Sequence, residues 1–529
     1  MKKGLKASLA LSLVASMVIA GCSSNNGGNT PAATEKPSTT NNQATTAPAN
    51  EEPIEISMIG STWEVPTEDN TYVQQYLEEK FNVKFINYRA NDENFKVKIA
   101  GGEIPDIFPH NIGEADMVNW ARQGVIASIS VDEIKQYMPN YVADVESIDP
   151  NAWDIGLVDG KNYGIPRVWL NGSTGFIPTY NGEWLEKVGI SAPTTLEEFE
   201  QMLIKFRNDD PDGNGQKDTY GMTGRGKDAR AQLFNTIYAA YGVNPYHFKV
   251  AEDGSIVWGG ITEEAKEATK LINKWYNDGL IDPEFMTDDN GLIGQKFNSK
   301  KVGFIENNMY HHLYGQQATF AENGITPVYG KGLMGPAGKS LQMSNGALQV
   351  PLLLGSHLEK DDAKRIRILQ ILDELATNDE IYATTVFGEE GVTYEIDNGV
   401  PKLVEPYASD ADARLGEGIG GYYNPFVERA VSTWKFHMPQ DRLEFKEKLT
   451  AGAEVISDVL GPSVMDSKAK YFANLSALQD EYFTKAIIAK NEAEVETILA
   501  DFKAQWLKAG GQEVIDEANK LYQERQAAK

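Results

Sequence analysis

The alternation of strand and helix patterns at the start of the globular region most constrains the fold of this chain. Segment 54–60, IEISMIG, has the alternating apolar residues of a strand, and 71–82 has apolar residues at helical spacing. A second strand pattern follows at 83–89. Because a β-α-β opening favours a parallel sheet, we predict an α/β fold. About 480 residues follow residue 52, which is too many for one small core, so we expect at least two lobes.

Two further segments predict helices. In 196–207 an apolar stripe recurs at helical spacing, and Thr195 with Glu198 forms the pattern of a capping box. The region from 466 to the end is strongly helical, and within it 493–511 carries an apolar stripe before two glycines.

The N-terminus has the features of an export signal. Three lysines precede the short apolar run 7–20, and the residues VIAGC follow. The run is too short for a permanent membrane helix. Residues 19–22 resemble the bacterial lipobox, so we predict a lipoprotein signal peptide over 1–22 with lipidation at Cys22. The alternative is an ordinary signal peptide with an incidental cysteine. Cys22 is the only cysteine, which excludes an internal disulfide.

Residues 23–52 have the composition of a disordered linker. The stretch 23–50 is rich in Ser, Thr, Asn, Gly and Pro and holds no large apolar residue, so it cannot offset the entropy cost of ordering. Later segments lack the run of about 20 apolar residues that a membrane helix needs. We therefore expect a globular body tethered by lipid to the outer face of the bacterial cell membrane.

The chain is strongly acidic. Its formal net charge is −27, and it becomes −30 when the three lysines of residues 1–22 leave with the signal peptide. Such a charge repels phosphates, so we predict that nucleic acid is not a partner. A few local arginines could still hold an anionic sugar. The general acidity itself is explained by solubility outside the cell.

The known catalytic motifs are absent from the sequence. The six histidines form no HExxH or other zinc spacing, and no GxSxG or Walker A motif occurs. His311 and His312 are adjacent, but neighbouring residues seldom bind one ion together. A pair of carboxylates for glycoside hydrolysis stays open, because their separation in space is invisible in a sequence. We predict that the protein is not an enzyme.

Several segments together resemble one family. AGGEIPDIF at 100–108, VDGKNYGIPR at 158–167, the helix region 180–206 and FGEEGVTYEIDNGVP at 387–401 occur in the order seen in extracellular solute-binding lipoproteins of bacterial carbohydrate ABC transporters. The likeness is to family 1 sugar-binding proteins, in the branch with LplA-like and alginate-oligosaccharide-binding proteins. The sequence departs from that pattern at Gly182, where the family usually has lysine, and at Thr219, where glutamate is common.

The resemblance implies a two-lobed fold like that of periplasmic binding proteins, with a hinge and an inter-lobe cleft. The first lobe would hold 53–166 and 346–397, and the second 167–345 and 398–529. Ligand binding would close the lobes. The partners would be an oligosaccharide and the permease subunits of an ABC transporter, with the binding protein itself a monomer.

Sugars present apolar faces and a rim of hydroxyls, so a sugar site needs aromatic rings and polar side chains with several hydrogen-bonding atoms. The aromatic candidates lie where loops should open to the cleft: Trp63, Trp169, Tyr310, Tyr422, Tyr423 and Trp434. The polar candidates are Asp106, Arg167 and Asn307, of which Asp106 is equally explained as a structural turn residue. The number of aromatics favours an oligosaccharide over a monosaccharide.

The stretch DPDGNGQKD at 210–218 has the pattern of a calcium loop. The predicted ligands occupy its first, third, fifth, seventh and ninth places: Asp210, Asp212, Asn214, Gln216 and Asp218. A sensor EF-hand also needs a glutamate at the twelfth place, which here is Gly221. We therefore predict a structural calcium ion in the second lobe, away from the cleft. The alternative is a solvated turn without an ion.

Two other functions remain open at this point. One is a secreted glycan-degrading enzyme, which requires two opposed carboxylates and measurable turnover. The other is a lipoprotein that binds peptides or metal complexes, for which a deep site for charged termini is expected.

Overall fold

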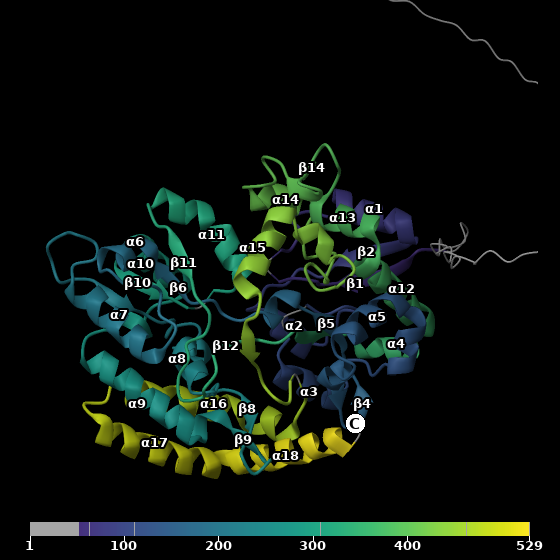
Figure 1. The fold of residues 1–529 in the computed structure, drawn as a ribbon. Coiled ribbons are helices and arrows are strands. Elements are labelled where there is room, and N and C mark those ends of the chain that lie inside the picture. Colours follow the sequence, from purple (N-terminus) through teal and green to yellow (C-terminus); the bar gives the residue numbers. More distant parts are fainter. Residues whose placement is uncertain (1–51, 63, 110–111, 307, 462, 528–529) are drawn as a thin grey trace, which may run out of the picture. The chain divides into compact units, whose positions relative to one another are not determined.

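Two hydrophobic cores organise the part of the chain described by the computed structural model, which covers residues 52–527 without 63, 110–111, 307 and 462 (Figure 1). The first core gathers buried residues from 56–168, 348–381 and 419–430. The second gathers them from 176–343 and 460–518. We call the elements around these cores the first lobe and the second lobe.

The first lobe starts with the predicted β-α-β unit. Strands β1 (Ile54–Met58) and β2 (Val83–Asn87) are parallel, with Ile54 opposite Val83. Helix α1 (Tyr72–Phe81) connects them. It begins where the Thr71 side chain accepts a hydrogen bond from the amide of Gln74, and it ends at Asn82, which takes the left-handed conformation.

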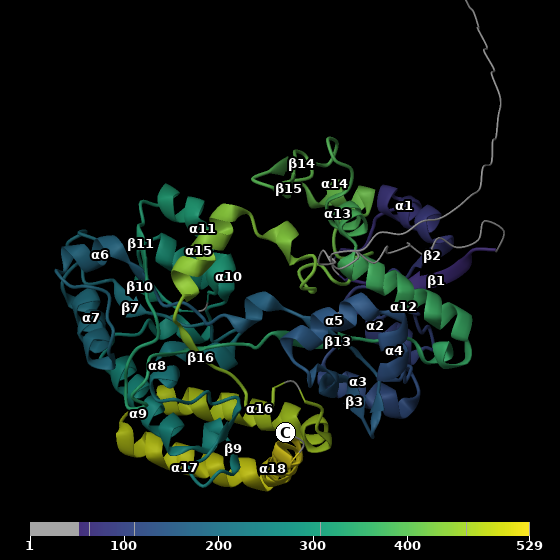
Figure 2. The ribbon, with the colours of Figure 1, turned by 45° about the vertical axis from the view of Figure 1, so that its right-hand side comes forward.

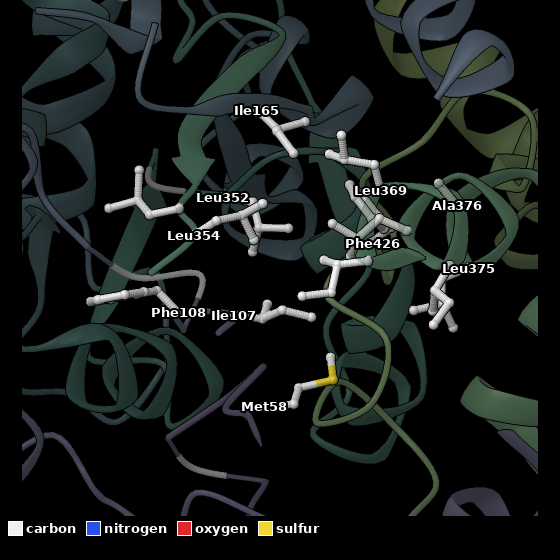
Figure 3. Packing of buried hydrophobic residues seen from close by; sticks show 14 of the residues in the cluster. Met58, Ile107, Phe108, Ile165, Leu352, Leu354, Leu369, Leu375, Ala376 and Phe426 are labelled. Carbon is white, nitrogen blue, oxygen red and sulfur yellow. The ribbon is translucent and has the colours of Figure 1, made fainter. Parts of the chain in front are cut away.

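Single β-bridges widen this sheet beyond β1. Ile107 bridges Met58 on one side and Leu354 on the other. Figure 3 shows these side chains and Phe108 packed in the first core, with Leu369 and Phe426 from distant parts of the chain. Helix α12 contacts β1, and Figure 1 shows helices around this sheet. The helices are α2 (Phe95–Ala100), α3 (Glu114–Gln123), α4 (Val131–Tyr137), α5 (Pro139–Ile148), α12 (Asp362–Thr377) and α13 (Asp379–Phe387).

The second lobe contains a mixed sheet in the order β11-β6-β10-β7. Strand β10 runs parallel to β7 and antiparallel to β6. The strands are β6 (Thr179–Asn181), β7 (Tyr220–Met222), β10 (Val302–Ile305) and β11 (Pro327–Tyr329). The helices that follow in this lobe are α6 (Gly182–Lys187), α7 (Leu196–Asn208), α8 (Asn235–Ala240), α9 (Glu263–Asn277), α10 (Asn290–Asn298) and α11 (Tyr310–Glu322).

Helix α7 forms where its apolar stripe and cap predict it. The Thr195 hydroxyl accepts from the amide of Glu198 at 3.2 Å. The Glu198 carboxylate binds the amide and hydroxyl of Thr194, both at 2.8 Å, one residue earlier than an ordinary capping box. Its stripe packs in the second core, with five buried side chains: Leu196, Phe199, Met202, Leu203 and Phe206.

Three long helices end the chain, as the sequence predicts: α16 (Asp466–Ile487), α17 (Glu492–Trp506) and α18 (Gln512–Ala527). The turn between α17 and α18 depends on glycine. Gly510 has a φ of 119°, and a Cβ on Gly511 would lie 2.1 Å from the Trp506 ring. Trp506 stacks on Trp258 with ring centroids 5.7 Å apart, which fixes these helices on the second core. None of the helices within the described ranges is long and apolar enough to cross a membrane.

The chain passes between the cores along two paired strands. β5 (Ile165–Val168) leads from the first lobe, and β13 (Leu348–Leu352) returns antiparallel to it. A later passage follows residue 430, which still packs in the first core, and reaches α15 (Gln440–Thr450) in the second lobe. Figures 1 and 2 both show α15 beside α11, in agreement with the contacts between these two helices.

Candidate ligand-binding site

Trp169 and Tyr310 come together where the chain enters the second lobe. Trp169 follows β5, and Tyr310 is the first residue of α11. Both rings lie edge-on to His311, with centroids 6.3 Å and 5.7 Å away. The Tyr310 ring is fully buried and its hydroxyl donates to Asn171, whereas Trp169 is partly exposed. Of these two aromatic candidates, only Trp169 offers surface in this structure.

Arg429 is a residue that the sequence analysis missed. Its guanidinium lies 5.5 Å from the centre of the Trp169 ring, and its Nη1 donates to the carbonyl of Glu428 at 2.9 Å. Burial lowers the pKa of Arg429, although Glu428 opposes this. Within the described ranges no carboxylate oxygen lies within 4.0 Å of this guanidinium. The segment PFVERAV gives no pattern that would have singled this arginine out.

Helix α15 adds two more cations to this region. The Arg442 guanidinium lies 5.9 Å from the Tyr314 ring centre, and Lys446 Nζ lies 5.6 Å from that of Tyr310. Arg442 is 3.7 Å from the Glu428 carboxylate and donates to the carbonyl of His437 at 2.9 Å. Burial lowers the pKa of Lys446. We call Trp169, His311, Arg429, Arg442 and Lys446 the crossing cluster.

His311 is neutral in this environment. Burial, together with the charges of His312, Arg442 and Arg429, lowers its pKa to about 3. Its Nδ1 is buried and has no hydrogen-bond partner among the described residues. A neutral imidazole can donate through one nitrogen and accept through the other, which suits a sugar hydroxyl.

Arg167 belongs to the crossing strand β5, and its side chain reaches β13 and the segment at Pro425. It is 1% exposed, and it donates to the carbonyls of Val350 at 3.1 Å and Pro425 at 3.4 Å. Burial, with the nearby charge of Arg429, lowers its pKa to about 9. Its contacts favour a role in joining strands rather than in touching ligand.

Asp106 is at the centre of an ion cluster inside the first lobe. It is fully buried, with His357 Nε2 at 2.6 Å and Lys364 Nζ at 2.7 Å. The amide and hydroxyl of Ser57 also donate to it, at 2.6 Å and 3.0 Å. These contacts agree with the structural explanation that the sequence left open.

The expectation that Tyr422 and Tyr423 lie in a loop open to the cleft is wrong. Tyr422 is 1% exposed and donates to the carbonyl of Met58 at 2.8 Å, and Tyr423 is fully buried beside Asn87, to which it donates at 2.7 Å. The loop packs tightly because Gly60 lies against it, where a Cβ would be 2.0 Å from the Tyr422 carbonyl. Trp434 is partly buried in a short 3-10 helix, 434–437. Trp63 and Asn307 lie outside the described residues.

The predicted calcium loop closes on itself directly after α7. Asn214 Nδ2 donates to Asp212 at 2.8 Å and lies 3.2 Å from Asp218, so an amide occupies the space between two carboxylates. Asp210 accepts from the amide of Gly215 at 3.2 Å, while its Oδ1 is buried without a partner among the described residues. Burial and the charges of Asp210 and Asp218 raise the pKa of Asp212.

These residues fit a cation, although in this structure their side chains are not arranged as a ligand shell. In the described part of the chain, no group of three or more His, Cys, Asp or Glu side chains is positioned to hold a metal ion. Rotating the Asn214 amide would exchange its donor for an oxygen in the same place. The twelfth place, Gly221, lies in β7, where a Cβ would be 2.4 Å from the Leu203 side chain. The packing of β7 on α7 therefore leaves no room for an EF-hand glutamate.

Two known bacterial proteins are similar to this chain in sequence. Lipoprotein LipO of Bacillus subtilis is 26% identical over 470 residues, which cover 85% of this chain and 88% of LipO. The fructooligosaccharide ABC transporter substrate-binding protein FusA of Streptococcus pneumoniae is 28% identical over 357 residues, 64% of this chain and 63% of FusA. This last alignment spans less than two thirds of the relative.

Solved structures share the fold at low identity. FusA in complex with kestose aligns with a TM-score of 0.65 and 21% identity over 90% of this chain and 100% of FusA. The alginate-binding protein AlgQ2 without calcium ion aligns with a TM-score of 0.67 and 16% identity, over 90% of this chain and 99% of AlgQ2. The fold is therefore the two-lobed α/β fold of periplasmic binding proteins, as the sequence predicts.

The family follows from a direct match of the sequence. The model of the bacterial extracellular solute-binding protein family matches residues 71–383, which is more than half of the chain. This confirms the resemblance noted in the sequence, and the relative FusA is a substrate-binding protein of an ABC transporter. The chain belongs to the family of bacterial extracellular solute-binding proteins.

Proposed function

We propose that this protein binds an oligosaccharide between its two lobes and delivers it to an ABC-type permease without chemically changing it. One observation carries the proposal. Trp169 and Arg429 lie on two of the passages between the cores, and they meet beside His311 of α11 in the second lobe. A ligand held there would contact both lobes at once, which is what a binding protein that closes on its ligand requires.

The residues of the crossing cluster suit a sugar. Trp169 offers part of an aromatic ring, neutral His311 can bind a hydroxyl, and Arg429 supplies several N–H donors. FusA, a relative, is a fructooligosaccharide-binding protein, which supports a sugar of more than one unit. The burial of Tyr310, Tyr422 and Tyr423 leads us to leave them out of the surface that we propose for the ligand.

The direct test is ligand binding by the protein and by Trp169→Ala. We expect oligosaccharides, and not peptides or siderophores, to raise the melting temperature, and we expect Trp169→Ala to weaken sugar binding about tenfold through loss of aromatic contact. The matched control is Trp153→Ala, since Trp153 packs on the first core and bonds Glu146 at 3.3 Å. Equal sugar affinity in the wild type and Trp169→Ala would place the site elsewhere.

A glycan-degrading enzyme is the alternative function, and a turnover assay distinguishes it from a binding protein. No observation in the described residues favours it, since Glu428 is the one carboxylate in direct contact with the crossing cluster and a hydrolase needs two. Hydrolysis of any glycan at roughly one turnover per second would contradict the transport proposal.

We also propose that lipidated Cys22 anchors the protein to the outer face of the cell membrane. Support comes from the lipobox pattern and from the relative LipO, a lipoprotein; Cys22 itself lies outside the described residues. A diacylglyceryl group supplies the two hydrophobic signals that stable attachment takes. We expect Cys22→Ser to release the protein into the medium or leave it unprocessed, as fractionation and mass spectrometry would show. A processed, membrane-bound mutant would contradict this.

We further propose that the loop at 210–218 binds one structural calcium ion. The side-chain oxygens of Asp210, Asp212, Asn214 and Asp218 and the carbonyl of Gln216 would hold it. The ion would neutralise carboxylates at a place where burial, together with the charges of Asp210 and Asp218, raises the pKa of Asp212. That the AlgQ2 structure is described as one without calcium ion agrees with a role for calcium in this fold.

The lobe boundaries remain a proposal. Tyr422, Tyr423 and Phe426 pack in the first core, which favours moving the last boundary from 397 to about 431. The first lobe would then hold 53–166 and 346–431.

A further inference from the structure

We propose that the crossing cluster receives the carboxylate of an acidic sugar, so that the ligand is an oligosaccharide containing uronic acid units. This inference rests on the proposed function and specifies its substrate class. It is carried by an excess of positive charge at the place where the lobes meet, in a chain whose formal net charge is −27.

The first observation is the charge count around Trp169. Arg429, Arg442 and Lys446 surround the aromatic residues of α11 and Trp169. Glu428 is the one carboxylate within 4.0 Å of any of these cations among the described residues, and it lies 3.7 Å from Arg442. Other arginines do have a paired carboxylate: Arg225, for example, forms a two-pronged pair with Asp228 at 3.0 Å.

Other acids near α15 do not remove this excess. Asp441 is exposed and accepts from the Tyr314 hydroxyl at 2.6 Å, and Glu447 is exposed on the same helix. Charges that face solvent are screened by water and salt, whereas Arg429 and Lys446 are partly withdrawn from water. Among the described residues, Arg429 and Lys446 therefore have no carboxylate within 4.0 Å to balance their charge.

The second observation is that Arg429 is held in place by neutral contacts. Its side chain lies over the Trp169 ring and, among the described residues, hydrogen-bonds a backbone carbonyl, that of Glu428. Burying a cation without a carboxylate in direct contact costs free energy, and burial lowers the pKa of Arg429 although the charge of Glu428 partly opposes this. An incoming carboxylate would offset this free-energy cost, because guanidinium and carboxylate match in shape and form paired hydrogen bonds.

The third observation concerns two nitrogens with no partner. Arg442 Nε and His311 Nδ1 are both buried and unpartnered among the described residues. Buried polar atoms normally have hydrogen-bond partners. A carboxylate and a neighbouring hydroxyl on one uronic acid unit would provide oxygens for this region, whereas a neutral sugar would leave Arg429 and Lys446 without a carboxylate beside them.

The test compares acidic and neutral ligands of matched length. Isothermal titration would be run with short oligogalacturonates and oligomannuronates, and with neutral galacto- and fructo-oligosaccharides. We expect the acidic sugars to bind more tightly, with affinity that falls as salt is raised. We expect Arg429→Gln to weaken acidic sugars about tenfold or more, and Arg429→Lys to restore part of the loss.

A control variant and a second test variant accompany Arg429→Gln. Arg230→Gln removes an exposed arginine 3.8 Å from Asp480 and should leave binding unchanged. Arg429→Gln should fold, since the Tyr141 hydroxyl bonds the backbone carbonyl of Arg429, at 3.1 Å, and not its side chain. If it does not fold, Lys446→Gln serves as the same test.

Three results would overturn the inference in distinguishable ways. Binding of neutral but not acidic oligosaccharides contradicts the uronic acid proposal and leaves the proposed function standing. Acidic sugars that bind equally to the wild type, Arg429→Gln and Lys446→Gln place the carboxylate elsewhere. Failure of both sugar classes to bind removes the proposed function and this inference together.

Discussion

At Asp106 one buried carboxylate connects three parts of the first lobe. It joins Ser57 at the sheet, His357 in a 3-10 turn and Lys364 on α12. Burial alone would raise the pKa of Asp106, but the hydrogen bonds from His357, Lys364 and Ser57 hold it below its usual value. The ionised form is therefore the one that the fold stabilises.

We expect Asp106→Asn to lower the free energy of unfolding by about 3 kcal/mol, because it leaves the Lys364 ammonium without its buried partner. Asp116→Asn is the control, since Asp116 and Lys96 are 33% and 61% exposed and such pairs contribute at most about 1 kcal/mol. Urea titration of both variants measures the difference. Equal stability of the two would mean that the buried cluster contributes nothing.

The same residue predicts a pH dependence. Because the pKa of Asp106 is lower in the folded protein than in the unfolded chain, its stabilisation is complete above about pH 4 and is lost as the pH falls through the lowered value. The stability difference between wild type and Asp106→Asn should therefore shrink on acidification. A difference that stays constant from neutral pH down to pH 3 would contradict this assignment.

At the scale of elements, the loop between α7 and β7 is held by the helix that precedes it. Arg207 of α7 donates to the carbonyls of Lys217 and Thr219, at 3.1 Å and 2.8 Å. The proposed calcium ion would add a second connection between the end of α7 and β7.

Removing calcium should therefore reduce stability and leave sugar affinity nearly unchanged. At a calcium concentration a hundredfold above the dissociation constant, the ion would contribute ~2.7 kcal/mol. We expect chelator to lower the melting temperature of the wild type and to have no effect on Asp212→Ala. Asp209→Ala, one residue before the loop, should respond to chelator as the wild type does. An unchanged wild-type melting curve would exclude a bound ion, and loss of sugar binding in folded protein would place the ion in the ligand site.

Elements that depend on local patterns could be predicted from the sequence. The first β-α-β unit, α7 and the three C-terminal helices form where periodicity and caps indicate. These signals lie within about ten residues, so no distant contact is needed to recognise them.

The candidate site depends on distant contacts and could be predicted only in part. Trp169 is singled out by its position after β5, but Arg429 matters only because the chain returns to Trp169 some 260 residues later. Tyr422 and Tyr423 follow glycines that are typical of exposed loops. Their burial depends on Gly60, because only a residue without a Cβ lets this loop pack so closely against the first sheet. No pattern around residues 419–423 carries that information.

At the scale of the whole molecule, the C-terminal helices connect the two lobes through charged side chains. Arg525 of α18 binds Asp154 of the first lobe through Nε at 3.0 Å and Nη2 at 2.6 Å. Lys468 of α16 pairs with Glu114 of α3 at 2.9 Å, and Arg122 of α3 pairs with Asp466. These pairs lie outside the crossing strands, so they constrain the lobes independently of the crossing cluster.

Arg525 is the member of this set with the most bonds, because it also donates to Ser463 Oγ at 2.6 Å and to the carbonyl of Leu460. Its side chain and that of Asp154 are 20% and 33% exposed, so water screens the pair only in part. We expect Arg525→Met to remove about 2 kcal/mol of stability, given the usual contribution of hydrogen bonds to charged groups. Hydrogen exchange should then rise in two places at once, the 3-10 helix at 152–156 in the first lobe and α18 in the second.

The matched control for Arg525→Met is a cation that pairs within one lobe. Lys270 of α9 lies 3.1 Å from Glu267 and 2.5 Å from Glu492, all in the second lobe. Lys270→Met should raise exchange in α9 and α17 and leave the first lobe unchanged. High salt should reproduce the Arg525→Met pattern weakly, because the pair is only partly exposed. If Arg525→Met raises exchange in α18 alone, the contact with Asp154 does not couple the lobes, and the crossing strands carry that coupling by themselves.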